Sequence, residues 1–237
     1  HPVNACIQFM GMLEGASVTT IEGIAPQGDG APDLHPCQQV MVDHHGSQCG
    51  FCTPGFVMSL FAAWCNGDGL AADEIDTTLA GNLCRCTGYR PIVEAAAALT
   101  VRAIPPAYET SRRRREAELM DKIAHDETVV LGDGRRRFIA PAQKEAFAQA
   151  YAGSPGATIV AGATDVGLWV TKQNRHLPDM IWTGRVAGFD KVAKSGVHWR
   201  IGPAVTHAEA MTALAEGRPD LAEVMRRFGS VQVRASG

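Results

Sequence analysis

The chain has no long hydrophobic run and no strong excess of charge of either sign. Its 237 residues include 22 Lys and Arg against 25 Asp and Glu, which gives a formal net charge of −3. A net charge this small produces no field that would recruit nucleic acid or an anionic membrane. The longest apolar stretches are also shorter than the roughly 20 residues that a membrane-spanning helix needs. We therefore expect a cytoplasmic protein with neither a nucleic-acid partner nor a membrane partner.

A secretory segment is also missing, and the number of cysteines, seven, is odd. Both observations argue against a framework of disulfides. Four of the cysteines nevertheless follow a pattern, because Cys49 and Cys52 form a C-x2-C pair and, after thirty-one intervening residues, Cys84 and Cys86 form a C-x-C pair. Four thiolates brought together repel one another and lose solvation unless a cation compensates. The pattern therefore predicts a metal centre.

The spacing leaves two kinds of metal centre open. Structural zinc sites built from four thiolates are common, but zinc ribbons usually offer two C-x2-C pairs. An iron-sulfur cluster suits four thiolates that are delivered from helix ends and tight turns. The spacing favours the cluster over zinc and places disulfides third. With zinc, the protein would be a non-catalytic interaction module with a purely structural metal.

The cysteines are predicted to lie beside helices. Thr53 and Pro54 are typical of an N-cap and a first helical position, and an apolar stripe of period near 3.6 follows them. Further helices are predicted from Asp73 to Ala80 and from Tyr89 onward. The first two sulfurs would then lie at a helix N-terminus, where the helix dipole favours a thiolate.

The strings around the cysteines carry a specific resemblance. Residues 46–56 read GSQCGFCTPGF, and residues 81–92 read GNLCRCTGYRPI. Together they closely resemble the helical [2Fe-2S] domain of the xanthine dehydrogenase and aldehyde oxidase family of molybdenum hydroxylases. The resemblance implies that Cys49, Cys52, Cys84 and Cys86 ligate one [2Fe-2S] cluster. It also implies that Gln48 reaches a molybdopterin cofactor in a partner domain, and that Cys86 is the ligand nearest to the pterin.

The first residues of the chain resemble the end of another domain of this family. In the family an Asn-Ala-Cys string supplies the last ligand of a plant-type [2Fe-2S] cluster, and here this string ends at Cys6. The three earlier ligands, in a C-x4-C-x2-C pattern, are missing, and so is an initiator methionine. We expect residues 1–23 to be the C-terminal remnant of a ferredoxin-like domain, with a strand at the N-terminus and another from Ser17 to Ile21. Cys6 is a candidate ligand in a longer protein, or else a buried apolar cysteine.

The middle of the chain is rich in arginine and poor in apolar periodicity. Pro105 and Pro106 precede four consecutive arginines at 112–115, and three more follow at 135–137. This composition predicts a solvated linker over residues 104–136. Cys37 and Cys65 have no partner spacing and are predicted to be core residues.

Beyond the linker, residues 157–170 predict a strand, a glycine-bearing turn and a helix. Backbone amides in such a turn can point at phosphate oxygens, although a plain strand-to-helix connection would look similar. Residues 158–167, TIVAGATDVG, resemble the first FAD-binding loop of the same family. The resemblance implies that the FAD diphosphate is wrapped by Ile159, Val160, Ala161, Gly162, Ala163, Thr164, Asp165 and Val166. It places an apolar flavin contact at Ile201, and residues 232–237 resemble the approach to a second FAD loop that is missing.

These observations predict an α+β chain. A helical [2Fe-2S]-binding domain at residues 24–103 would be followed by the N-terminal part of an α/β FAD-binding domain at 137–237. The resemblance implies a xanthine dehydrogenase-type oxidoreductase with two [2Fe-2S] clusters and FAD in the full protein. This chain would hold no catalytic residue, and it would pass electrons from a molybdopterin-binding subunit or domain to FAD and then NAD in a hetero-oligomer.

The substrate pocket would belong to the molybdenum domain. The resemblance implies hydroxylation of xanthine or hypoxanthine. An aldehyde or another N-heterocycle is the alternative substrate, and this chain does not distinguish between them.

Overall fold

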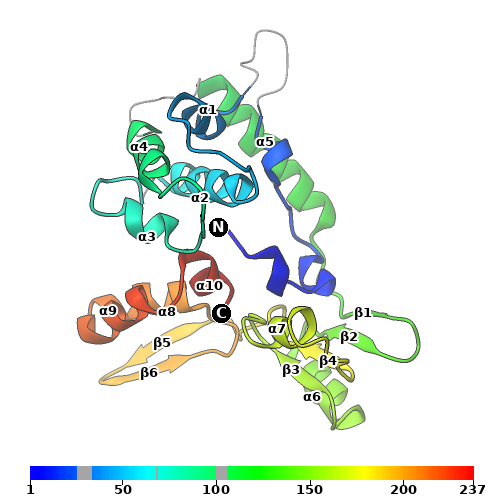
Figure 1. Cartoon of the computed structure of the whole chain (residues 1–237). Coiled ribbons are helices and arrows are strands. Elements are labelled where there is room, and N and C mark those ends of the chain that lie inside the picture. The colour runs from blue at the N-terminus through cyan, green and yellow to red at the C-terminus, as the bar shows by residue number, and fades with distance from the viewer. Residues whose placement is uncertain (26–33, 68, 100–105) are drawn as a thin grey trace. The chain divides into compact units, whose positions relative to one another are not determined.

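The computed structural model of the chain describes residues 1–25, 34–67, 69–99 and 106–237. These residues form two compact units, the first of residues 1–2 and 17–122 and the second of residues 3–16 and 123–237. Helices dominate the first unit, whereas both sheets belong to the second (Figure 1). The predicted α+β class is therefore confirmed.

Short helices around α2 build the first unit (Figure 1). Its elements are η3 (Ile21–Gly23), α1 (Pro36–Asp43), α2 (Thr53–Asn66), α3 (Ile75–Leu79), α4 (Arg90–Leu99) and α5 (Pro106–Ile123). The predicted helices at 53, 73 and 89 correspond to α2, α3 and α4. Helix α1 begins at a cap in which the Nδ1 atom of buried His35 accepts the N–H group of Cys37 at 3.1 Å. This cap has no common sequence signature.

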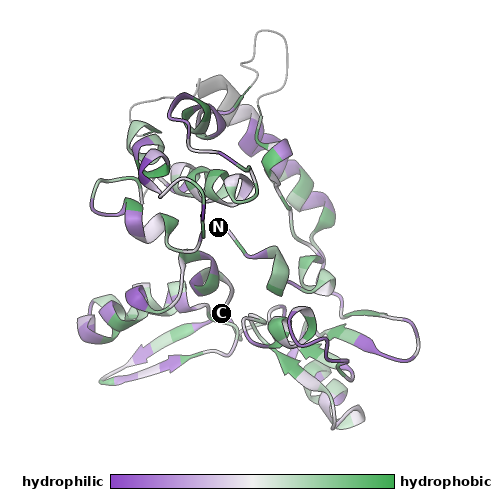
Figure 2. Ribbon diagram, viewed as in Figure 1, coloured by the Kyte–Doolittle hydropathy of each residue, from purple (hydrophilic) through white to green (hydrophobic). Residues whose placement is uncertain are grey.

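A single apolar core holds α1 to α4 together. Phe56, Leu60, Ile92 and Leu99 are at most 1% exposed, and α2 carries little hydrophilic colour in Figure 2. Burying side chains of this kind contributes about 1.5 to 3 kcal/mol each, which is the main stabilisation available to such short helices. Cys37 is fully buried in this core, as predicted.

The expected linker contains regular structure. Helix α5 occupies most of it, and strand β1 (Val129–Gly132) follows, while residues 104 and 105 lie outside the described residues. Arg112 pairs with Glu116 at 2.5 Å and Arg114 with Glu118 at 3.7 Å, both with i,i+4 spacing. Pairs at this spacing support a helix without an apolar stripe. Apolar periodicity therefore fails to reveal this helix.

The N-terminal segment forms 3-10 helices where a strand was expected. Ala5–Ile7 forms η1 and Met10–Leu13 forms η2, while residues 17–20 join no sheet among the described residues. A strand needs a neighbour for its backbone hydrogen bonds, and no described strand pairs with this segment. Gly11 instead packs on the ring of Phe138, where a Cβ atom would lie 2.3 Å from a ring carbon.

The second unit contains a four-stranded sheet with the order β1-β2-β4-β3. Strand β2 (Arg137–Ala140) is antiparallel to β1, whereas β2, β4 (Met180–Trp182) and β3 (Thr158–Val160) are parallel. Helix α6 (Lys144–Gly153) connects β2 to β3, and α7 (Val166–Thr171) connects β3 to β4. Ala140, Val160 and Ile181 are fully buried in this sheet.

The rest of the second unit is a hairpin followed by helices. Strands β5 (Val192–Ser195) and β6 (His198–Ile201) precede α8 (His207–Ala215), α9 (Pro219–Arg227) and α10 (Val231–Ser236). A capping box starts α8, because Thr206 Oγ1 accepts the Glu209 N–H at 3.2 Å and the Glu209 carboxylate accepts the Thr206 N–H at 2.8 Å. Among the described residues, no helix is both long and apolar enough to cross a bilayer.

Candidate functional site

Two turns of the first unit bring the four patterned cysteines together. Cys49 lies in the turn before α2, and Cys52 is the residue on which α2 begins. Cys84 and Cys86 lie between α3 and α4. The Sγ atoms of Cys49 and Cys86 are 3.4 Å apart, although 37 residues separate them in the chain. The two cysteine motifs therefore meet at their sulfur atoms.

The thiols form two pairs, and each pair joins one motif to the other. The Cys86 thiol donates to the sulfur of Cys49, and the Cys52 and Cys84 thiols are close enough for each to shift the pKa of the other. The N–H group of Phe51 lowers the pKa of Cys49, whereas the hydrogen bond to Cys49 raises the pKa of Cys86.

The pKa values of Cys52 and Cys84 also move in opposite directions. The Thr87 hydroxyl, 3.3 Å from the sulfur, lowers the pKa of Cys84 to about 7. Burial raises the pKa of Cys52 to about 11. Each pair thus combines one thiol that loses its proton readily with one that keeps it. Metal binding would release the protons that remain, since the thiolate is the ligand.

The second cysteine turn is held by residues that the sequence analysis did not single out. The Tyr89 hydroxyl accepts the backbone N–H of Cys84 at 2.9 Å, and Thr87 Oγ1 accepts the N–H of Tyr89 at 3.1 Å. Gly88 and Tyr89 both have left-handed backbone conformations, with φ of +69°. For tyrosine this conformation is uncommon and costs of order 1–3 kcal/mol, which the surrounding contacts must offset. The side chain of Asn82 donates to Ser59 of α2 at 2.7 Å and ties the turn to that helix.

The donor set fits a two-iron cluster. A [2Fe-2S] cluster is held by four cysteine sulfurs, and thiolates are the ligands that such clusters take. The four sulfurs here lie in two pairs, as two irons with two protein ligands each would require. Within the described residues, no group of three or more His, Cys, Asp or Glu side chains is arranged to hold a single metal ion.

Gln48 and Cys6 are both exposed. Gln48 directly precedes Cys49 in the first unit. Cys6 lies in η1 and belongs to the second unit, so it is not part of the four-cysteine group.

The second candidate site is the loop that follows β3. Residues 161–165 connect the buried end of β3 to α7, as the strand, turn and helix pattern predicted. Ala163 takes a left-handed conformation with φ of +59°, and its carbonyl accepts the N–H of Gly167 at 2.8 Å. Trp182 donates its indole N–H to the carbonyl of Ala161 at 3.1 Å. The loop therefore has one defined shape.

Backbone N–H groups of this loop are available to a ligand. Among the hydrogen bonds of the described residues, none uses the N–H of Gly162, Ala163 or Thr164. Successive free amides in a turn can bind the oxygens of a phosphate. Ile159 is 47% exposed, whereas Val160 is fully buried. Of the residues expected to wrap a diphosphate, Val160 is thus a core residue that can contribute backbone groups only.

Gly162 is required by the chain itself. A Cβ atom at this position would lie 1.8 Å from the carbonyl oxygen of Ser236, at the end of α10. The resemblance places Gly162 among the residues around a diphosphate, and the contact with Ser236 adds a packing role. Ile201 is 42% exposed at the end of β6, in the separate two-stranded sheet.

His207, the first residue of α8, lies near the end of α10 and near Thr164 of the loop after β3. Its N–H group donates to the Gly237 carbonyl at 2.5 Å. A Cβ atom at Gly237 would lie 3.0 Å from His207 Nδ1 and 3.1 Å from a methyl carbon of Thr164. His207 is half-buried, and its ring centroid lies 5.5 Å from that of Phe228.

Comparison with known families assigns both regions. Residues 20–97 match the family described as "[2Fe-2S] binding domain", and residues 134–237 match "FAD binding domain in molybdopterin dehydrogenase". The first match contains all four patterned cysteines. The second contains the loop after β3.

Individual relatives carry names from one enzyme group. The chain is 31% identical to xanthine dehydrogenase of Drosophila subobscura in an alignment that is 262 positions long and covers 95% of this chain. It is 53% identical over 95 residues to aldehyde oxidase 1 of Oryctolagus cuniculus, and 50% identical over 96 residues to xanthine dehydrogenase 2 of Arabidopsis thaliana, each covering 40% of this chain. The matched part spans 19% of the Drosophila protein and 7% of each of the other two.

Proposed function

Because this chain belongs to the molybdenum hydroxylase family and holds its iron-sulfur and FAD region, we propose that it carries electrons from a molybdopterin centre through [2Fe-2S] clusters to FAD and then to NAD. The hydroxylation that releases these electrons takes place on a partner subunit or domain. Bound [2Fe-2S] clusters and FAD supply the redox chemistry, and the chain supplies their binding sites.

The observation that carries the proposal is the pairing of the four cysteines across two turns. Cys49, Cys52, Cys84 and Cys86 hold one [2Fe-2S] cluster. The buried face of α2 and the Tyr89 and Thr87 hydrogen bonds fix the sulfurs in place. Hydrogen bonds to sulfur and exclusion of solvent are the means by which a protein tunes the potential of such a cluster.

The loop after β3 holds the FAD diphosphate. The free N–H groups of Gly162, Ala163 and Thr164 bind phosphate oxygens, and the exposed Ile159 and the Asp165–Val166 turn flank them. Ile201 is an apolar contact for the flavin. Cys6 serves as the last ligand of a second, plant-type cluster in the longer protein, whose first domain ends near residue 23.

The exposed turn around Cys49 faces the molybdenum partner. Gln48 directly precedes Cys49, and its exposed amide reaches the pterin. Phe51 in this turn is 94% exposed, and Leu83 in the second cysteine turn is 65% exposed, so both turns carry apolar surface that a partner would cover. The protein is therefore a component of a hetero-oligomer, or of a longer chain with the same neighbours.

Xanthine or hypoxanthine is the proposed substrate of the whole enzyme. The xanthine dehydrogenase of Drosophila is matched along 95% of this chain, whereas the aldehyde oxidase 1 of rabbit is matched along 40% at higher identity. An aldehyde is the second candidate for this reason. Steady-state assays with xanthine and with an aromatic aldehyde, each with NAD as acceptor, distinguish the two.

Chemical analysis tests the cofactors directly. The purified protein should contain iron and acid-labile sulfide in equal amounts, with a visible absorption that dithionite bleaches, and flavin should be released by acid. Zinc without iron or sulfide would yield a colourless protein. That result would establish the alternative of a structural interaction module.

A further inference from the structure

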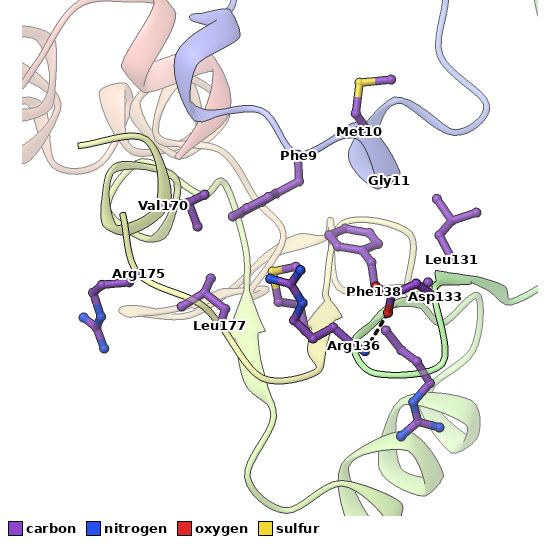
Figure 3. A pocket seen from close by; sticks show the side chains of 13 residues that line it. Phe9, Met10, Gly11, Leu131, Asp133, Arg136, Phe138, Val170, Arg175 and Leu177 are labelled. Carbon is purple, nitrogen blue, oxygen red and sulfur yellow. Dashed lines mark hydrogen bonds between the residues drawn. The ribbon is translucent and has the colours of Figure 1, made fainter. Parts of the chain in front are cut away.

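The second unit contains a cavity of about 390 Å³ that the proposed function does not use. It is lined by Phe9, Met10, Gly11, Leu131, Gly132, Asp133, Arg136, Arg137, Phe138, Val170, Arg175, Leu177 and Met180. In Figure 3, the rings of Phe9 and Phe138 lie on one side of the cavity, and Val170 and Leu177 lie on another. A volume of this size is typical of sites for small organic molecules.

The cavity and the loop after β3 lie at opposite ends of the parallel strands. Arg137 and Met180 are the first residues of β2 and β4, whereas the loop follows the last residue of β3. Because β2, β4 and β3 are parallel, the loop lies at their carboxyl ends and the cavity at their amino ends. Cofactors of open α/β sheets bind at the carboxyl ends. The cavity is therefore separate from the proposed FAD site.

The walls of the cavity carry an excess of positive charge. Three arginines face one carboxylate, that of Asp133, which accepts the backbone N–H groups of Arg135 and Arg136 at 3.0 and 3.2 Å. The guanidinium of Arg137 is paired with Asp179 and with Ser154, outside the cavity lining. Without Arg137, the lining carries the positive charges of Arg136 and Arg175 and the negative charge of Asp133, which gives a net charge of +1.

The Arg136 guanidinium is in a position to bind an anionic group of a ligand. Its side chain reaches from the start of β2 into the middle of the cavity in Figure 3, and its Nη1 atom lies 3.4 Å from Nδ1 of His176. Arg175 lies over the ring of Trp169, 4.5 Å from its centroid. Within the described part of the chain, no ion pair joins either arginine to a carboxylate. A guanidinium with its fork exposed is suited to a carboxylate.

We propose that this cavity binds a small aromatic carboxylate. The ring of the ligand packs against Phe9 and Phe138, whose centroids are 6.2 Å apart, and the carboxylate accepts hydrogen bonds from Arg136. Aromatic side chains favour offset or edge contacts with such a ring. Gly11 allows the Met10–Leu13 turn to lie close to Phe138 and so keeps this wall in place.

Calorimetric titration of the cofactor-loaded protein tests the proposal. The probe is 2-naphthoate, and its neutral counterpart is 2-naphthamide. We expect one binding site for 2-naphthoate with an affinity at least about tenfold higher than for 2-naphthamide, since a hydrogen bond to a charged group is lost in the amide. Arg136→Gln should weaken 2-naphthoate binding by a similar factor and leave 2-naphthamide unaffected. Arg136→Lys should restore part of the affinity.

Arg200→Gln is the matched control, because it removes one exposed arginine of β6 from the same unit. It should not change the affinity for 2-naphthoate, and flavin-free protein should bind 2-naphthoate as tightly as the cofactor-loaded protein does. Absence of binding would overturn the proposal, as would equal affinities for the acid and the amide. Equal effects of Arg136→Gln and Arg200→Gln, or displacement of 2-naphthoate by FAD, would also overturn it. None of these outcomes depends on whether the four cysteines hold a cluster.

Discussion

The four-cysteine turns and the loop after β3 would bind their proposed cofactors in different ways. In the proposed function, Cys49, Cys52, Cys84 and Cys86 act through side chains whose identity determines the metal chemistry. The loop would act through backbone N–H groups, so that Thr164 or Ala163 could be many other residues with the same conformation. A site made of side chains can be altered without changing the fold. A site made of backbone can be altered only by changing the conformation or the packing around it.

The largest expected effect comes from removing one sulfur. Cys84→Ser should abolish the visible absorption and the bound iron, and it should prevent reduction of FAD by the partner, because serine is a poor ligand for a [2Fe-2S] cluster. Iron and sulfide analysis together with the absorption spectrum measures this. Cys65→Ser, which changes a partly buried cysteine outside the four-cysteine group, is the control and should retain the colour. A fully coloured Cys84→Ser protein would contradict the ligand assignment.

The second-largest effect is expected from adding a methyl group where the loop after β3 packs against the end of α10. Gly162→Ala places a methyl group 1.8 Å from the Ser236 carbonyl, so that either α10 or the loop must move. Such overpacking costs about 1–3 kcal/mol in the free energy of unfolding, and the loop conformation changes with it. We expect the ratio of flavin to protein to fall several-fold while the iron content stays unchanged.

Gly156→Ala is the matched control for this change, because no atom lies within 4 Å of a Cβ atom at that position. Flavin content and chemical denaturation measure both variants. Equal flavin content in the two variants would show that the loop does not hold the cofactor.

A smaller effect is expected from a hydrogen bond that supports the backbone of the second cysteine turn. Tyr89→Phe removes the hydroxyl that accepts the Cys84 N–H at 2.9 Å and leaves the ring contact with Phe56, 6.3 Å between centroids, intact. Loss of one such bond costs about 0.5–1.5 kcal/mol. The cluster should be lost to a chelator faster than in the original protein. Tyr151→Phe, at an exposed position of α6, should change nothing, and equal chelation rates for the two variants would contradict a supporting role for Tyr89.

The smallest effect concerns pH. Hydrogen bonds from the Arg137 side chain lower the pKa of Asp179. A carboxyl group with a lowered pKa contributes stability above its unfolded pKa of about 3.9, and this contribution is lost as the pH falls through the folded value. The free energy of unfolding of the second unit should therefore decline below about pH 4, and Asp179→Asn should flatten this decline. Thermal unfolding between pH 3 and pH 6 measures this, and Asp121→Asn of α5 is the control. If Asp179→Asn and Asp121→Asn both showed the pH dependence of the original protein, the prediction would be contradicted.

The contrast also explains how much of the molecule could be predicted from its sequence. Helices α2 and α4 were predicted, because Thr53-Pro54 and the apolar stripe are local signals. The arrangement of the cysteines into cross-motif pairs was not, since it depends on the packing of two turns against α2. The contact that makes Gly162 necessary joins residues more than 70 positions apart.

Two expectations failed, and one helix was not predicted. Helix α5 is supported by ion pairs with i,i+4 spacing, while the expected N-terminal strand lacks a described strand to pair with. Helix α1 begins at His35, a buried cap residue whose ring contacts the rings of Phe61 and Trp64. Apolar periodicity along the chain reveals none of these features.

Trp182 makes the loop after β3 visible to spectroscopy. Its indole donates to the Ala161 carbonyl, and its ring lies 6.2 Å from that of Phe138. Tryptophan emission shifts with the polarity and hydrogen bonding around the indole. The protein thus carries a native optical reporter at its proposed flavin site, and the arrival of a nucleotide could be followed by light alone, without a chemical label.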